Sequence, residues 1–319
     1  MYHTTPSNGT YAGESANEPL SSEAKETRRL LARVIVIEEG WTDTLYHDLE
    51  EEATLTDYLS SSSSGYGVDS NGKGRWTALP HTPVGALQLS ARLTEIISSI
   101  IAHLSVHGEN EATRQAVNTH SPPPTGIDGA LVRKTPASRA YLEWSNVASA
   151  FSVRPDGLPL TGAKQVSSIV DQCQEIFAHQ PNRNFIRSLI ITQSSARLVH
   201  CDHTGTYLTP PINIHDRPHT FIRLILGLSS ANESILGFDV SIQWTIHPVS
   251  GKKGVGTIEA LDEENIMTSY TLAANEPPFI QAILGRGTTC WCATHPVNGE
   301  RVVIKDSWRP ELLIPVDAG

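Results

Sequence analysis

Apolar residues recur every three or four positions in several stretches of the chain, which is the spacing that lines one face of a helix. The longest stretch is Val84–His107, and Ala163–His179 and Thr220–Leu228 have the same pattern. Shorter helices are expected at Thr44–Leu59 and after Ser21, whose hydroxyl is a suitable cap. The helix after Ser21 would have an apolar face made of Leu30, Leu31, Val34 and Ile35. Stripes of this kind indicate packing into a core.

Short apolar runs bounded by turn residues predict strands in the second half of the chain. The strands expected in the middle are Trp144–Val153, Ile186–Thr192, Arg197–Cys201, Thr206–Leu208 and Asp239–His247. From Tyr270 onward the pattern changes to short strands with tight turns. Asn298 and Gly299 indicate a hairpin between Trp291–Thr294 and Arg301–Lys305. The predicted fold class is therefore α+β, with a helical N-terminal region, a central α/β domain and a final β-sheet.

Polar runs divide the chain into parts. Residues 1–20 are rich in Pro, Ser, Asn and Gly, which predicts disorder. Serines and glycines predict a flexible insert at 60–76, and three consecutive prolines indicate a linker at 111–139. The predicted parts are a disordered 1–20, a helical region 21–110 that contains the insert, the linker 111–139, an α/β domain 140–275 and a β-rich segment 276–319.

The composition limits the cellular compartments and the binding partners that are expected for this chain. The net charge of −10 argues against nucleic-acid binding, because phosphate backbones bind cationic surfaces. No apolar run is long enough to cross a bilayer, and the chain does not begin with the basic and apolar pattern of a secretory signal. Four cysteines in 319 residues do not make a disulfide framework. We therefore expect an intracellular protein, cytoplasmic or nuclear, that binds no membrane.

A glycine-rich turn precedes a lysine-bearing strand near the end of the chain. Gly285 and Gly287 come just before Thr288, and Lys305 ends the run Val302-Val303-Ile304-Lys305. Glycines let backbone amides approach phosphate closely, and a lysine on the third strand supplies a cation to the same phosphates. Gly285, Gly287, Thr288 and Lys305 are therefore the predicted nucleotide-binding residues. The alternative is an ordinary hairpin whose glycines serve only the turn.

Five blocks of sequence together resemble the fungal-type protein kinases. The blocks are Gln180-Pro181-Asn182-Arg183, Asp202-His203-Thr204-Gly205, Leu236-Gly237-Phe238-Asp239, Gly285-Arg286-Gly287-Thr288 and Val303-Ile304-Lys305-Asp306-Ser307-Trp308. The resemblance runs from about Trp144 to Pro310 and implies an accessory domain followed by the first strands of a kinase domain. The segment 276–319 would then be a truncated kinase N-lobe. For a complete kinase the resemblance also implies ATP and Mg²⁺, and otherwise no cofactor.

The catalytic loop and the metal-binding aspartate of the resembled family have no counterpart before Gly319. We therefore expect a truncated kinase-like protein without a complete set of catalytic residues and without phosphotransfer activity. Its expected role is to bind a protein partner, such as a full-length relative. The alternative is the N-terminal part of an active ATP-dependent kinase whose C-lobe is missing from this chain.

The resemblance also implies a particular accessory domain, one similar to a degenerate restriction-endonuclease-like fold. At the positions of the metal-binding acid and the lysine, this chain would have Ser152 and Arg154, and Asn146 would replace an aspartate. A serine offers no anionic oxygen to Mg²⁺. A metal-dependent nuclease is therefore a third and disfavoured alternative.

His200, Cys201, Asp202 and His203 have the chemistry of metal ligands. Neighbours on a strand point to opposite faces, however, so we predict no metal site there.

Cys290 and Cys292 share one face of their strand, where we expect burial or pocket lining. By the resemblance, Cys290 stands at the third glycine position and Cys292 at that of the valine over the adenine. His215 and His219 lie near the apolar helix, but no nucleophile in a recognisable context accompanies them.

Overall fold

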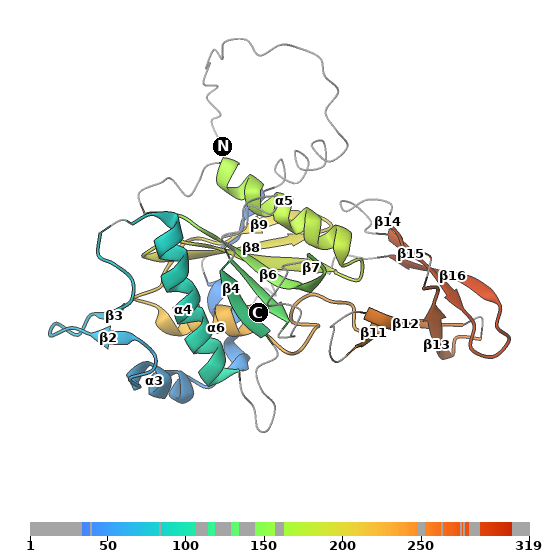
Figure 1. Cartoon of the computed structure of the whole chain (residues 1–319), viewed down its shortest axis with the longest axis horizontal. Coiled ribbons are helices and arrows are strands. Elements are labelled where there is room, and N and C mark those ends of the chain that lie inside the picture. The colour runs from blue at the N-terminus through green and yellow to red at the C-terminus, as the bar shows by residue number, and fades with distance from the viewer. Residues whose placement is uncertain are drawn as a thin grey trace, which may run out of the picture.

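A computed structural model describes residues 34–38, 40–82, 84–105, 114–118, 129–133, 144–156, 163–247, 253–262, 264–274, 276, 278–280 and 288–307. The disorder predicted at 1–20, and the residues Gly285 and Gly287, lie outside these ranges. Within them the fold is α+β, as predicted, with an eight-stranded sheet, a six-stranded sheet and a two-stranded hairpin (Figure 1).

The eight-stranded sheet is mixed, with the strand order β1-β9-β8-β7-β6-β5-β4 and with β10 paired to β8 beside this path. The strands are β1 (Val34–Val36), β4 (Arg114–Asn118), β5 (Gly129–Arg133), β6 (Val147–Val153), β7 (Phe185–Ile191), β8 (Ser195–Asp202), β9 (Gly205–Leu208) and β10 (Ile212–Asn213). β6 and β7 are parallel because α5 (Ala163–His179) crosses between them. Short turns join β7, β8 and β9, which therefore run antiparallel.

Helices cover both faces of this sheet, with α5 on one face and α4 (Ala86–Leu104) and α6 (Pro218–Leu228) on the other (Figure 1). β8 shows how one strand contributes side chains to the cores on both faces of the sheet. Ala196 and Leu198 belong to the core beneath α4 and α6, whereas Val199 and Cys201 belong to the core beneath α5. The predicted helices α4, α5 and α6 are thus confirmed, as are the predicted strands β6 to β9. No helix in the described part of the chain is long and apolar enough to cross a membrane.

Two predictions for the N-terminal region are corrected within the described residues, although residues 21–33 of the helix predicted after Ser21 lie outside them. Val34–Val36 does not continue a helix but forms β1, which runs parallel to β9. Three consecutive β-branched residues favour an extended strand once a partner edge is present. The helix predicted at Thr44–Leu59 is divided into α2 (Trp41–Thr44), the 3₁₀ turn η1 (His47–Leu49) and α3 (Glu52–Ser60).

The flexible insert predicted at 60–76 is wrong, because that segment folds as the hairpin of β2 (Tyr66–Val68) and β3 (Gly74–Trp76). Trp76 is completely buried, and its indole N–H donates to the Ile214 carbonyl at 2.9 Å. The Trp76 backbone N–H donates to Nδ1 of His215 at 3.2 Å. Packing against a distant part of the chain therefore orders a segment that looks like a linker by composition.

The linker predicted at 111–139 is also corrected. β4 and β5 lie inside it, and β5 pairs with β6 of the sheet. Ala130 and Leu131 of β5 are buried, one in each core layer. The boundaries of the predicted parts stay a prediction.

The six-stranded sheet is antiparallel, with the order β11-β12-β13-β15-β14 and with β16 paired to β15. Its strands are β11 (Ile242–Ile246), β12 (Lys253–Leu261), β13 (Met267–Leu272), β14 (Phe279–Ile280), β15 (Thr288–Thr294) and β16 (Arg301–Ser307). The sheet lies beside the first one (Figure 1). One of its faces forms a small core that includes Ile242, Ile258, Tyr270, Trp291 and Ala293.

Candidate functional site

β15 and β16 form the hairpin that Asn298 and Gly299 predicted. The cross-strand pairs include Thr288 with Ser307, Cys290 with Lys305, Cys292 with Val303, and Thr294 with Arg301. Gly299 has φ 71°, a left-handed backbone conformation that suits glycine. β14 pairs with the opposite edge of β15. The glycines Gly285 and Gly287 are thus in the connection between two antiparallel strands, although they lie outside the described residues.

One face of the hairpin is open. Along β16 exposed and half-buried positions alternate, and the exposed ones are Arg301, Val303, Lys305 and Ser307. Val303 is 65% exposed. Cys290 and Cys292 are half-buried across from this strand. The open face therefore presents one lysine beside two thiols and an apolar side chain, with the buried Thr288 at the end nearest the glycines.

The other face of the hairpin packs into the core of the six-stranded sheet. Trp291 is buried there, and Ile304 packs against the same cluster. Asp306 is on this side, where burial and then the Asp239 carboxylate raise its pKa, while nearby His203 opposes the shift. The carboxyl group of Asp306 therefore lies within electrostatic range of residues beside the first sheet, and it points away from the face of Lys305.

Two of the sequence blocks meet where the sheets join. Arg183 is 2% exposed, and its guanidinium donates to the carbonyls of Leu236 and Ala148 and to Oε1 of Gln180 at 2.9 Å. The same group lies over the ring of Phe238, 4.0 Å from its centroid. Burial, followed by repulsion from Arg114, lowers the pKa of Arg183 to about 9. Arg183 thus binds both segments at the cost of a desolvated charge.

Backbone contacts complete this joint. The Asn184 N–H donates to the Gly237 carbonyl at 2.7 Å, and the Asp239 N–H donates to the Asn182 carbonyl at 2.8 Å. Gly237 has φ 92°, and a Cβ added there would stand closer than 3.0 Å to the carbonyl oxygen of Phe185. The segment that enters β11 is therefore fixed against the first sheet, and this position requires glycine.

A polar cluster that sequence reasoning missed lies on β7 and β8. Nε–H of Arg187 donates to Nδ1 of His200 at 3.2 Å, and Nη1–H donates to the Tyr46 hydroxyl at 2.9 Å. Nε2 of His200 faces Oδ2 of Asp202 at 3.5 Å, and Oδ1 of Asp202 accepts the Thr204 N–H at 2.7 Å. Burial lowers the pKa of His200. The available signal was the spacing of His200 and Asp202, which places both side chains on one strand face.

The four consecutive residues considered as metal ligands do not converge. His200 and Asp202 belong to the polar cluster above, whereas Cys201 is in the core beneath α5. His203 packs against Phe177, with 5.3 Å between ring centroids. The side chains therefore alternate between faces, as strand geometry requires.

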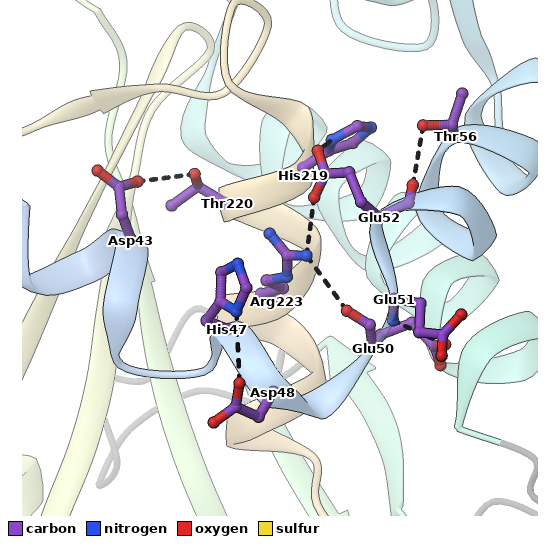
Figure 2. A network of polar contacts seen from close by, with 10 residues as sticks. All are labelled: Asp43, His47, Asp48, Glu50, Glu51, Glu52, Thr56, His219, Thr220 and Arg223. Carbon is purple, nitrogen blue, oxygen red and sulfur yellow. Dashed lines mark hydrogen bonds and ion pairs between the residues drawn. The ribbon is translucent and has the colours of Figure 1, made fainter.

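The two histidines considered for catalysis have separate structural partners. His219 pairs with Glu52, which also accepts from Nη2 of Arg223 at 2.8 Å (Figure 2). The hydrogen bond from His219 is the main cause that lowers the pKa of Glu52. Nε2 of His215 contacts the Gln193 carbonyl at 2.9 Å, and its Nδ1 accepts from the hairpin β2–β3. Both histidines therefore hold neighbouring segments together, α3 against α6 in the case of His219.

The residues compared with a nuclease site are also separated. Ser152 is buried within β6, where every position is buried. Asn146 precedes β6 and Arg154 follows it, so the two lie at opposite ends of the strand. Arg154 Nη2 donates to the Ser168 hydroxyl of α5 at 3.3 Å.

Comparison with known proteins identifies one family. Residues 126–312, more than half of the chain, match the family model described as fungal protein kinase. No curated protein and no solved structure matches the chain.

Proposed function

The chain belongs to the fungal protein kinase family, and on this premise we propose that the open face of the β15–β16 hairpin binds a nucleotide. The six-stranded sheet would then be a partial kinase N-lobe. The eight-stranded sheet and its helices would be the accessory domain, of a degenerate restriction-endonuclease-like kind. Lys305 would pair with phosphate oxygens, while Gly285, Gly287 and Thr288 would offer backbone N–H groups. The observation that carries the proposal is that Lys305 is exposed, two pairs along from Thr288, on one face of the hairpin.

The order of residues along the hairpin supports a nucleotide that lies lengthwise. The Cys292–Val303 pair offers a partly apolar floor for a flat base. The Cys290–Lys305 pair comes next and brings the cation. Thr288 follows and leads to the glycines, where phosphate would approach the backbone. The residues present therefore fit a base at one end and phosphates at the other.

The residues present fit Mg²⁺ less well. This ion takes oxygen ligands, usually carboxylates together with substrate phosphates. Asp306 is the carboxylate of β16, and it faces the other side of the sheet. In the described part of the chain, no group of three or more His, Cys, Asp or Glu side chains could hold a metal. Any Mg²⁺ would therefore come with the nucleotide, and we assign it no ligand from the hairpin.

For this polypeptide by itself we propose nucleotide binding without phosphoryl transfer. The 319 residues contain no His-Arg-Asp segment, and transfer requires a base and a metal-binding aspartate. The same hairpin would hold the nucleotide of an active kinase if further residues supplied these groups. Among the described residues β16 pairs only with β15. The second edge of β16 could therefore pair with further kinase strands or with a strand of a protein partner, such as a full-length relative.

The test is titration of the purified chain with a fluorescent ATP analogue, followed by displacement with unlabelled ATP. We expect saturable binding, and about tenfold weaker binding by Lys305→Gln, because a charge-assisted contact is lost. Lys73→Gln is the matched control, since Lys73 is exposed between β2 and β3 and its replacement changes the net charge equally. Equal affinity of the two variants, or no saturable binding, would disprove the proposed site. Phosphate transfer above the level of Lys305→Gln would overturn the claim of inactivity.

A further inference from the structure

Two thiols share the open hairpin face with the exposed Lys305. Cys290 is paired directly with Lys305, and in an antiparallel sheet such partners have Cβ atoms about 4.5–5.5 Å apart. Cys292 is half-buried and projects from β15 to the same side. Arg301, at the end of β16, forms an ion pair with Glu276, and interactions with Cys292 and then with this carboxylate raise the pKa of Arg301. Partial exposure and neighbouring positive charge are the surroundings in which cysteines react.

The other two cysteines have the opposite surroundings. Cys173 of α5 and Cys201 of β8 are each 1% exposed, in the core between helix and sheet. Contact with Cys201 and then burial raise the pKa of Cys173 well above its usual value. Because the thiolate is the nucleophile, Cys173 is a poor one. The chain therefore holds an internal comparison between two accessible and two inaccessible thiols.

We propose that Cys290 and Cys292 form a modification site for small anionic disulfides of the glutathione type. One cysteine loses its proton to water and attacks a sulfur of the disulfide. A bond forms between the two sulfurs and the original S–S bond breaks, so the cysteine is oxidised and the leaving thiolate is reduced and takes up a proton. Lys305, exposed beside Cys290, attracts the carboxylates of the reagent. This chemistry goes beyond nucleotide binding and does not depend on it.

An external disulfide fits this site better than a bond between the two cysteines. Residues two apart on a strand have Cα atoms about 6.5–7 Å apart, by the rise per residue. This spacing is at the upper limit for a disulfide, and the two side chains point in the same direction. A bond between them would require the backbone to move, whereas a mixed disulfide requires only that the reagent approach the open face.

The test exposes the native chain to oxidised glutathione and locates adducts by peptide mass spectrometry. We expect adducts on Cys290 or Cys292, with Cys290→Ser and Cys292→Ser identifying the first to react. Cys173 and Cys201 should react only after unfolding in denaturant. At low ionic strength Lys305→Gln should slow the reaction about threefold, the size of one unit charge acting at about 6 Å in water. The Lys73→Gln control should react like the parent chain with both reagents. Neutral hydroxyethyl disulfide should lose less rate in Lys305→Gln than oxidised glutathione does, because it has no carboxylate for Lys305 to attract.

Two outcomes would overturn the proposal. The first is that neither hairpin cysteine reacts faster than Cys173 and Cys201 in the native chain. The second is that oxidised glutathione loses no rate in Lys305→Gln relative to the neutral reagent. Since a variant can unfold, the parent chain should also be measured at high salt. At high salt, screening should remove most of the excess rate of oxidised glutathione over the neutral disulfide. An excess rate that persists unchanged would also count against recognition by charge.

Discussion

Replacing Arg183 tests whether the joint between the two sheets depends on the guanidinium. Arg183 donates to the Leu236 and Ala148 carbonyls and to Gln180, and it covers the ring of Phe238. Arg183→Met keeps much of the apolar stem but leaves buried acceptors without donors. Arg183→Lys keeps the charge, but an ammonium cannot reproduce the planar fork that reaches three acceptors at once.

The expected loss in the free energy of unfolding is the balance of lost hydrogen bonds and relieved desolvation. Hydrogen bonds to a charged group contribute about 1.5–3 kcal/mol each, and an unsatisfied buried acceptor costs about 1–3 kcal/mol. Desolvation of the guanidinium offsets part of this, as the lowered pKa of Arg183 indicates. With three neutral acceptors left without a donor, the net cost after this offset is about 3–5 kcal/mol. We expect Arg183→Met to lose this much and Arg183→Lys to lose nearly as much.

The assay combines urea unfolding with hydrogen exchange. Exchange should accelerate at the amides of Asn184 and Asp239, which bridge the joint. Arg197→Met is the control, because Arg197 is also buried and its Nε–H donates to the Thr209 carbonyl at 2.8 Å, away from the joint. It should leave exchange at the two bridging amides unchanged. An Arg183→Met variant as stable as the parent would refute the reasoning, since it would mean that desolvation cancels the hydrogen bonds.

Two further predictions concern stability. Burial lowers the pKa of His215 and of His200 in the folded chain. Below about pH 6.5 the unfolded chain therefore binds more protons than the folded chain. The free energy of unfolding should be highest above this pH and fall as the pH decreases toward the lowered pKa values. Urea midpoints at pH 7.5, 6.5 and 5.5 check this, and His215→Gln should flatten the dependence; midpoints independent of pH would contradict it. Gly237→Ala should cost about 2 kcal/mol or more, from its left-handed backbone and the nearby Phe185 carbonyl. Gly40→Ala has a similar φ, 100°, with nothing within 4 Å of the added Cβ, so thermal melting should show a smaller loss there, and equal losses would exclude a steric term.

The sequence predicted elements whose own periodicity is strong. α5 has the predicted bounds because an apolar stripe between two buried strands leaves few alternatives. The errors fall where distant contacts decide the structure. Val34–Val36 becomes a strand because β9 offers it an edge, and residues 60–76 fold because Trp76 is buried against Ile214 and His215. Both partners are distant in the sequence, so the pattern of residues within each segment could not reveal these contacts.

The candidate site shows the same limit more sharply. A hairpin turn at Asn298 and Gly299, together with a period of two, is enough to put Lys305 and Asp306 on opposite faces of the sheet. The sequence does not reveal that Asp306 then comes within electrostatic range of Asp239 and His203, because Asp239 is held there by the backbone contacts of the joint at Arg183. The strand that carries the proposed nucleotide lysine thus interacts electrostatically, through its next residue, with groups beside the eight-stranded sheet. If the joint positions this strand, Arg183→Met should weaken nucleotide binding although the substituted residue lies outside the hairpin. Arg197→Met should leave nucleotide binding unchanged.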